Sequence, residues 1–139
     1  CRSASVWPIM PPIERPMNRP RIPSAASSPA QVAHADAAFT AAKAAYLGAG
    51  LASGRADLLA EALADRLHEP FRAADAPLLE QLRRDAPTGV AGVTLSGSGP
   101  TVVVWARKPH GAAVAAEIQR RFTDVRVLPL RVTAKGAWS

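Results

Sequence analysis

The sequence feature that most limits the fold is a pair of β-branched runs separated by a short glycine loop. The runs are GVAGVTL, residues 89–95, and PTVVVWAR, residues 100–107, and the loop between them reads Ser-Gly-Ser-Gly. Runs of this length and composition are typical of strands. Glycine and serine build tight turns, so the residues alone favour a hairpin of two antiparallel strands. We therefore expect the other segments to pack on a small antiparallel sheet.

Helical patterns precede the hairpin. Residues 32–54 are rich in alanine, carry large apolar residues near helical spacing and end at a glycine, which commonly terminates helices. A second helix is predicted over residues 55–70, which have one leucine stripe and a closing proline. A third is predicted over residues 75–85, with Asp75 as its N-cap and Pro77 in its first turn.

After the hairpin, residues 110–122 predict a further helix, and residues 124–132 alternate well enough to form a last strand. The order of helices, strand, loop, strand, helix and strand predicts an α+β fold, with a layer of helices on one face of a small antiparallel sheet. Three strands make a thin sheet, and we expect a fourth to come from sequence that precedes Cys1.

The first 31 residues differ from the rest in composition and periodicity. They hold seven of the 13 prolines and show neither a helical nor a strand period. Proline lacks a backbone N–H and keeps the preceding residue away from helical angles. We therefore predict a disordered or extended N-terminal tail over residues 1–31 and one folded domain over residues 32–139.

The charge pattern argues against a nucleic-acid partner. The formal net charge is +6, and about half of it lies in residues 1–31 and half in the remainder. The basic residues after residue 31 are scattered and have no stacking aromatic residue beside them, as on an ordinary mixed-charge surface. No apolar run reaches the ~18 residues of a membrane span, so no membrane partner is predicted either.

Cys1 is the only cysteine, so no internal disulfide can form, and a reducing cytoplasm is the simplest compartment. A chain that begins with cysteine is also what a lipid-anchored mature terminus would show after signal cleavage. A missing upstream portion is the interpretation that we favour.

The glycine loop is the first candidate site. Its glycines permit positive φ, so that consecutive backbone N–H groups can turn toward an anion, although a plain hairpin turn explains the same residues. A Walker P-loop is excluded because the loop lacks the required lysine and the following helix.

The second candidate is ADRLHEPFRA, residues 64–73, placed at a helix end and its exit. His68 follows Asp65 by three residues, a pairing that can orient an imidazole but is more often a surface contact. Arg72 can offer a planar fork to a carboxylate or phosphate, while a solvated side chain is the commoner state of an isolated arginine. No metal site is predicted, because the three histidines lie 34 or more positions apart and lack a thiol partner.

Together these segments resemble a known family. The stretch LSGSGPTVVVW, with DRLHEPFR about thirty residues before it and HADAAF further upstream, resembles the carboxy-terminal half of bacterial homoserine kinase, a member of the GHMP kinase superfamily. The resemblance covers about residues 29–135. The Pro-Thr pair after the loop, combined with DRLHEPFR, is fairly specific to the homoserine branch.

The resemblance implies a ferredoxin-like α+β domain and an activity. Homoserine kinases use ATP and Mg²⁺ to phosphorylate the side-chain hydroxyl of L-homoserine, on the route to threonine. By resemblance, Arg72 helps to hold the amino-acid substrate, and His68 and Asp65 shape the same pocket. The glycine loop corresponds to the third GHMP motif, which supports the phosphate-binding loop from below; its residues are Leu95, Ser96, Gly97, Ser98, Gly99, Pro100 and Thr101.

The sequence also departs from the family. The family's ATP loop, of the PxxxGLGSS type, and its catalytic acidic residue belong to an amino-terminal domain that has no counterpart here. A basic ARxxLP-like stretch of the family is replaced by SAASSP. We assign no catalytic residue and expect the chain to be inactive without a separate amino-terminal kinase domain. A shifted reading frame or a truncated gene is our hypothesis for the abrupt change at Pro29.

The alternative is a non-catalytic small-ligand module or a dimerisation module that forms a homodimer, derived from the same fold. An exposed apolar face would favour a kinase half with an absent partner domain. A polar, self-contained surface would favour the independent module.

Overall fold

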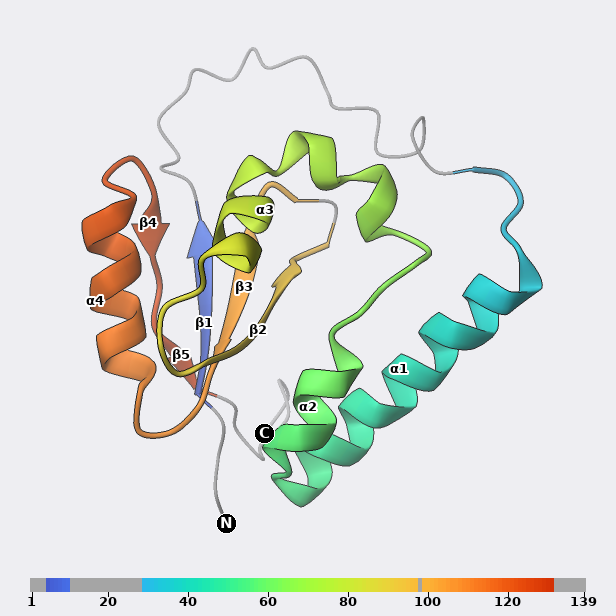
Figure 1. The fold of residues 1–139 in the computed structure, drawn as a ribbon, viewed down its shortest axis with the longest axis horizontal. Coiled ribbons are helices and arrows are strands. Elements are labelled where there is room, and N and C mark those ends of the chain that lie inside the picture. The colour runs from blue at the N-terminus through green and yellow to red at the C-terminus, as the bar shows by residue number, and fades with distance from the viewer. Residues whose placement is uncertain (1–4, 11–28, 98, 132–139) are drawn as a thin grey trace, which may run out of the picture.

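The computed structural model describes residues 5–10, 29–97 and 99–131 (Figure 1). From α1 onward, its elements follow the predicted order. They are β1 (Ser5–Met10), α1 (His34–Ser53), α2 (Ala56–Ala62), the 3-10 turns η1 (Glu69–Phe71) and η2 (Ala73–Asp75), α3 (Pro77–Arg84), β2 (Val90–Leu95), β3 (Val102–Ala106), α4 (Gly111–Arg121), β4 (Arg126–Val127) and β5 (Leu130–Arg131).

The glycine loop joins two antiparallel strands, as predicted. In the β2–β3 hairpin, Val93 lies opposite Val104 and Leu95 lies opposite Val102. The strand order is β2-β3-β1-β4, with β5 also paired to β1, and every pairing is antiparallel. This order, together with α3 and α4 as the connections, is the ferredoxin-like arrangement. The predicted α+β fold class is therefore confirmed.

The fourth strand comes from inside the segment that was predicted to be a tail. β1 is extended and lies between β3 and the β4–β5 pair, with Ser5 opposite Ala106 and Ile9 opposite both Val102 and Val127. Our expectation that this strand lies before Cys1 is corrected. The strand escaped prediction because it is short and contains Pro8, and proline is rare inside a sheet.

One face of the sheet carries the hydrophobic core. Alternate β3 residues are fully buried, and they pack against leucines of α3 and branched residues of α4. The central members of this cluster are Leu79, Leu82, Val93, Val102, Val104, Val114 and Ile118. A side chain that is fully buried in this way stabilises the fold by about 1.5–3 kcal/mol. The α3–α4 layer is therefore the main source of stability.

The opposite face of the sheet meets the first two helices. Gly92 lies opposite Trp105, and a Cβ atom at Gly92 would lie 2.1 Å from the Leu63 Cδ1 atom just after α2. On the same face, Trp105 Nε1 donates a hydrogen bond to Thr94 Oγ1 at 3.1 Å. α1 and α2 lie side by side (Figure 1), and residues of α1 and of the sheet line one common groove. The sequence did not predict this division of the helices between two faces.

Helix ends show where local chemistry competes with helix propensity. α1 ends as predicted, because Gly54 takes φ +67° and donates its N–H to the Gly50 carbonyl. α2 ends at Ala62, eight residues before the predicted Pro70. Its early end is due to Asp65, whose carboxylate bonds to the backbone that follows.

Two smaller predictions need correction. Ala76, and not Asp75, is the N-cap position of α3, although Pro77 does occupy the first turn. The predicted last strand over residues 124–132 is divided into β4 and β5. Pro129 lies between them and has no N–H to offer to a ladder.

An exposed ion pair marks the start of α2. The Arg55 guanidinium donates to both carboxylate oxygens of Asp57. This hydrogen-bonded pair lowers the pKa of the Asp57 carboxyl and raises that of Arg55. An acidic residue in the first turn also suits the positive end of the helix.

Candidate functional site

A groove of about 620 Å³ separates the first helices from the sheet. Its walls come from α1, from the segment after α2 and from the end of β2 with the start of the glycine loop. Asp65 and His68 line one wall, and Leu95, Ser96 and Gly97 line another. Residues from both sequence-predicted segments therefore meet at one groove, which makes it the candidate functional site.

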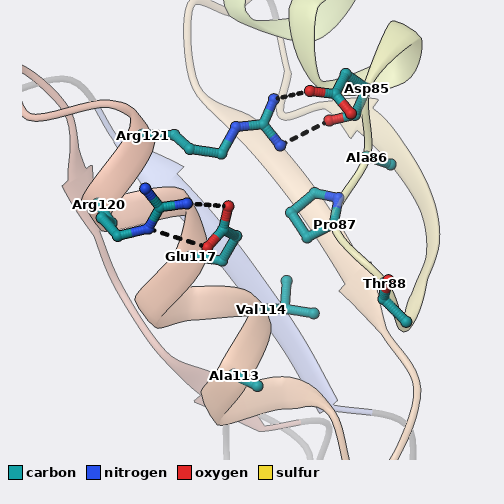
Figure 2. Close-up of a pocket in the computed structure, with 9 residues that line it drawn as sticks. All are labelled: Asp85, Ala86, Pro87, Thr88, Ala113, Val114, Glu117, Arg120 and Arg121. Carbon is teal, nitrogen blue, oxygen red and sulfur yellow. Dashed lines mark hydrogen bonds and ion pairs between the residues drawn. The ribbon is translucent and has the colours of Figure 1, made fainter.

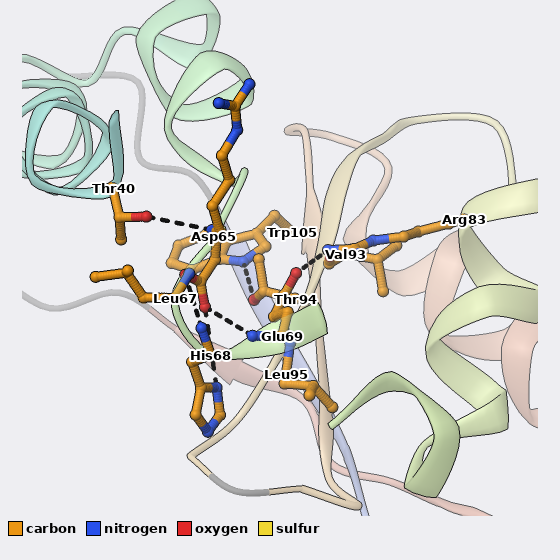
Figure 3. Close-up of polar contacts among 11 residues, drawn as sticks. Thr40, Asp65, Leu67, His68, Glu69, Arg83, Val93, Thr94, Leu95 and Trp105 are labelled. Carbon is orange, nitrogen blue, oxygen red and sulfur yellow. Dashed lines mark hydrogen bonds and ion pairs between the residues drawn. The ribbon is translucent and has the colours of Figure 1, made fainter. Parts of the chain in front are cut away.

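Asp65 organises the first wall through its carboxylate (Figure 3). Oδ1 accepts backbone N–H groups from Leu67 at 2.7 Å and His68 at 3.2 Å, and Oδ2 accepts that of Glu69 at 3.0 Å. A carboxylate that holds consecutive N–H groups forms a compact turn in place of a further helical turn. Asp65 thus determines the path of the backbone along the groove.

His68 stands on this turn with its ring partly exposed. Its Nδ1 atom lies 3.9 Å from Asp65 Oδ2, which is an electrostatic contact and too long for a hydrogen bond. Asp65 therefore orients His68 mainly through the backbone N–H of that residue. The imidazole is left partly open toward the groove and can contact a ligand there.

The glycine loop is a closed hairpin turn over its described residues. The Ser96 N–H donates to the Thr101 carbonyl at 2.9 Å, and the Gly99 N–H donates to the Ser96 carbonyl at 3.1 Å. Gly97 and Gly99 have φ of +57° and +77°, values that other residues adopt only with strain. Pro100 follows through a cis peptide bond, and Ser98 lies outside the described residues. Two of the loop amides are thus used inside the turn, which is what the hairpin interpretation requires.

An ion pair between the buried, groove-lining Glu69 and the more exposed Arg83 escaped sequence reasoning. Glu69 is 7% exposed, and its Oε2 atom accepts a bond from Arg83 of α3 at 2.5 Å. Its Oε1 atom accepts the N–H of Leu95 at 2.9 Å. Arg83 also donates from two nitrogens to the Val93 carbonyl. The two residues lie 14 positions apart, so no local spacing signals the pair.

The structure corrects one interpretation of Arg72. A solvated side chain was the commoner expectation for this isolated arginine, yet the residue is only 3% exposed. Arg72 is not among the residues that line the groove. Its guanidinium is enclosed in the fold beside the 3-10 turns η1 and η2.

Lys43 is a groove residue that the sequence did not single out. Its side chain is 17% exposed and its Nζ atom lies 3.4 Å from Glu61 of α2. The same atom lies 5.3 Å from the centre of the Phe39 ring and 5.7 Å from that of Tyr46. The lysine is thereby held along α1 by a carboxylate and two aromatic faces.

A second groove, of about 650 Å³, lies between α4 and the loop after α3 (Figure 2). Its two guanidinium groups are both paired: Arg121 bonds to Asp85 at 2.7 Å, and Arg120 bonds to Glu117 at 2.6 Å. None of the sequence-predicted site residues lines it. Its charges are already neutralised within the protein.

The described residues do not fit a nucleotide–magnesium site of their own. Within residues 5–10, 29–97 and 99–131, no three histidine, cysteine, aspartate or glutamate side chains gather where they could hold a metal ion. The Ser96 and Gly99 amides are occupied within their turn. We therefore derive no phosphoryl-transfer step from this chain. Over the same residues, no helix has the length and apolarity that crossing a bilayer requires.

The fold and the glycine hairpin define a ferredoxin-like α+β domain. Residues 41–124 match the family described as GHMP kinases C terminal, which is more than half of the chain. The chain belongs to this family.

The relatives within the superfamily are homoserine kinases, which confirms the predicted resemblance. The chain is 37% identical over 73 residues to homoserine kinase from Bacillus cereus strain B4264 and 33% identical to that from Bacillus thuringiensis strain Al Hakam. Each match covers 52% of this chain and only 25% of the relative. The chain therefore matches about a quarter of the length of these relatives.

Solved structures show the same fold. Homoserine kinase from Cytophaga hutchinsonii superposes with a TM-score of 0.74 at 22% identity, covering 94% of this chain and 43% of that one. A putative homoserine kinase from Listeria monocytogenes gives a TM-score of 0.66 and also matches over 43% of its length. At this level of identity, the likeness establishes the fold alone.

Proposed function

We propose that this chain is the carboxy-terminal part of a homoserine kinase and that it forms one side of the L-homoserine site. The observation that carries the proposal is the single groove shared by the DRLHEPFR segment and the glycine loop. These are the two segments on which the resemblance to homoserine kinases rests. The reaction, ATP-dependent phosphorylation on the route to threonine, would take place in the cytoplasm.

In this proposal the groove residues bind and position the amino-acid substrate, and none of them is catalytic. His68 and Asp65 shape the wall that meets the amino-acid substrate. Leu95 to Thr101 support, from below, a phosphate-binding loop that a separate amino-terminal domain supplies. ATP and Mg²⁺ would bind mainly to that domain, which would neutralise charge on the transferring phosphoryl group. The chain alone is therefore inactive.

The exposed surface of α1 supports the proposal that a second domain packs on this chain. This 20-residue helix buries only Gly50 and contacts mainly α2, and most of its alanines are exposed. Tyr46 is 46% exposed and Leu51 is 40% exposed on the same helix. An apolar helix left open is expected where a docking surface has lost its partner. The relatives, of which the chain matches only a quarter, have the additional length that such a domain needs.

The proposal is tested with the purified chain and the separately produced amino-terminal part of the Bacillus cereus enzyme. Calorimetry measures L-homoserine binding to the chain, and a coupled assay with ATP and Mg²⁺ measures phosphorylation. We expect no turnover by the chain alone and turnover when the amino-terminal part is added. Turnover by the chain alone would contradict the assigned inactivity. If no homoserine binds and no turnover appears in the mixture, the kinase assignment is wrong.

Two variants, His68→Ala and Arg72→Ala, locate the substrate contacts, and Arg126→Ala is their control. His68→Ala should weaken homoserine binding, whereas Arg126→Ala on exposed β4 should not. Arg72→Ala tests whether this buried arginine also holds the substrate, as the resemblance implies. Loss of binding with unchanged circular dichroism would support that role. Unchanged binding by Arg72→Ala would exclude it and leave the groove wall as the site of contact.

A further inference from the structure

Glu69 begins η1 where the first wall of the groove meets the sheet. The three N–H bonds accepted by Asp65 fix the backbone up to Glu69 itself. Glu69 is one of the residues that line the groove, yet it is only 7% exposed. A buried carboxylate is costly unless its oxygens are paired, so its partners reveal what it holds.

Both oxygens of Glu69 are used, and they join two different elements. Oε1 accepts the N–H of Leu95, the last residue of β2, at 2.9 Å. Oε2 accepts a bond from Arg83 on α3. Arg83 in turn donates to the Val93 carbonyl from Nε at 3.1 Å and from its terminal nitrogen at 2.9 Å.

The pair therefore occupies the outer side of an edge strand. β2 pairs with β3 on one side only, and Val93 and Leu95 direct an unpaired carbonyl and an unpaired N–H outward. A neighbouring strand would normally bond to such groups. Here Glu69 provides the acceptor and Arg83 provides the donor that the neighbouring strand would offer.

Leu95 is followed directly by the loop residues that line the groove. A charge-assisted bond to its N–H fixes the last peptide of β2 before Ser96 and Gly97 turn away. The loop has its own internal bonds, from Ser96 to Thr101 and from Gly99 to Ser96, which set its shape. The bond from Glu69 sets the position of the loop relative to the groove wall that contains His68.

We propose that Glu69, held by Arg83, is a positioning residue that sets the glycine loop against the opposite wall of the groove. This inference rests on the proposed function for its meaning in catalysis. The anchoring of the Leu95 amide by Glu69 can be tested without any ligand. The positioning role and the proposed function can therefore fail separately.

The first test is amide hydrogen exchange and ¹H–¹⁵N spectroscopy of the full 139-residue chain. Glu69→Gln keeps the shape of the side chain and removes its charge. Because a hydrogen bond to a charged group contributes about 1.5–3 kcal/mol, we expect the Leu95 amide to exchange roughly tenfold to a hundredfold faster. The Gly97 and Gly99 resonances should shift as well, because the loop is no longer anchored.

Ile118→Val is the matched control, since it weakens the same core from α4, whose main sheet contacts are with β1 and β4. It should leave the Gly97 and Gly99 resonances in place. Arg83→Lys is a second variant that keeps the charge but loses the fork, and it should reproduce the loop shifts in milder form. If Leu95 exchange in Glu69→Gln stays within twofold of the control, or if the control shifts the loop equally, the proposal is overturned.

The second test adds L-homoserine. In Glu69→Gln, we expect homoserine to bind at least about tenfold more weakly than in Ile118→Val, with both variants folded. Equal binding by the two variants would refute the positioning role even if the amide is anchored. If the unaltered chain binds no homoserine, the proposed function fails while the amide result still decides the inference.

Discussion

At the scale of single residues, the site depends on carboxylates whose partners are backbone groups. Asp65 accepts three N–H groups and Glu69 accepts one, so both act on the path of the chain. Such bonds explain why DRLHEPFR forms little regular helix.

We predict that Asp65→Ala destabilises the protein by about 1–3 kcal/mol, because three backbone donors beside the groove lose a charged acceptor. Urea unfolding followed by circular dichroism measures the change. Asp75→Ala removes a nearby exposed aspartate from a position where no side-chain cap is seen, and should change stability by less than about 0.5 kcal/mol. Equal losses in the two variants would contradict the assigned role of Asp65.

Residue identity predicted part of the site and missed the rest for a physical reason. Asp65 and His68 were found because their spacing suggested a local contact. The Glu69–Arg83 pair spans elements that become neighbours only through the sheet, and the burial of Arg72 depends equally on tertiary packing. Single-sequence patterns contain no record of either.

At the scale of elements, successive residues of each strand point to opposite faces of the sheet, and the two faces pack against different helices. Val93 and Val104 point into the core with α3 and α4, while Gly92 and Trp105 face the first helices. The absence of a side chain at Gly92 allows Leu63 to pack directly on β2. This close approach sets one side of the groove.

We predict that Gly92→Ala destabilises the protein by about 1–3 kcal/mol, because the new Cβ would meet Leu63 at 2.1 Å and the leucine must move. Thermal unfolding measures the loss. Gly48→Ala is the matched control, since its Cβ meets nothing within 4 Å and alanine favours a helix by about 0.5–1 kcal/mol. Leu63→Ala added to Gly92→Ala should recover part of the loss, and a further additive loss would contradict the assigned clash.

The elements were largely predictable because their signals are local. Alanine content, the Gly54 stop and the β-branched runs identified α1 and the hairpin directly from sequence. The end of α2 was missed because the Asp65 turn overrides a leucine stripe that continues past Ala62. β1 was missed because Ser5–Met10 gains its strand structure from pairing with β3, and not from its own composition.

At the scale of the whole molecule, one side is a finished core and the other side is open. The α3–α4 layer covers its face of the sheet, whereas α1 packs on α2 and leaves apolar surface exposed. The groove lies on the open side. This asymmetry is what we expect of a domain that completes its site with a second body.

We predict that Leu51→Glu weakens assembly with the amino-terminal part of a homoserine kinase by at least about tenfold, because it places a charge on the apolar surface of α1. Sedimentation velocity of the mixture measures the assembly. Leu130→Glu on β5 is the control, because Leu130 is at least as exposed, at 51% against 40% for Leu51, and lines a different groove with the start of α4. Self-association that only Leu51→Glu abolishes, without any assembly in the mixture, would instead indicate a homodimer.

The position of β1 has a consequence for biosynthesis. Ser5 pairs with Ala106 and Arg131, so the central strand is synthesised roughly a hundred residues before its partners. At 5–20 residues per second, this strand waits on the ribosome for roughly five to twenty seconds. The local β2–β3 hairpin can close as it emerges, but β1 can join the sheet only after β3 has been synthesised. During that interval, protection of the nascent chain by a chaperone would matter most for residues 5–10.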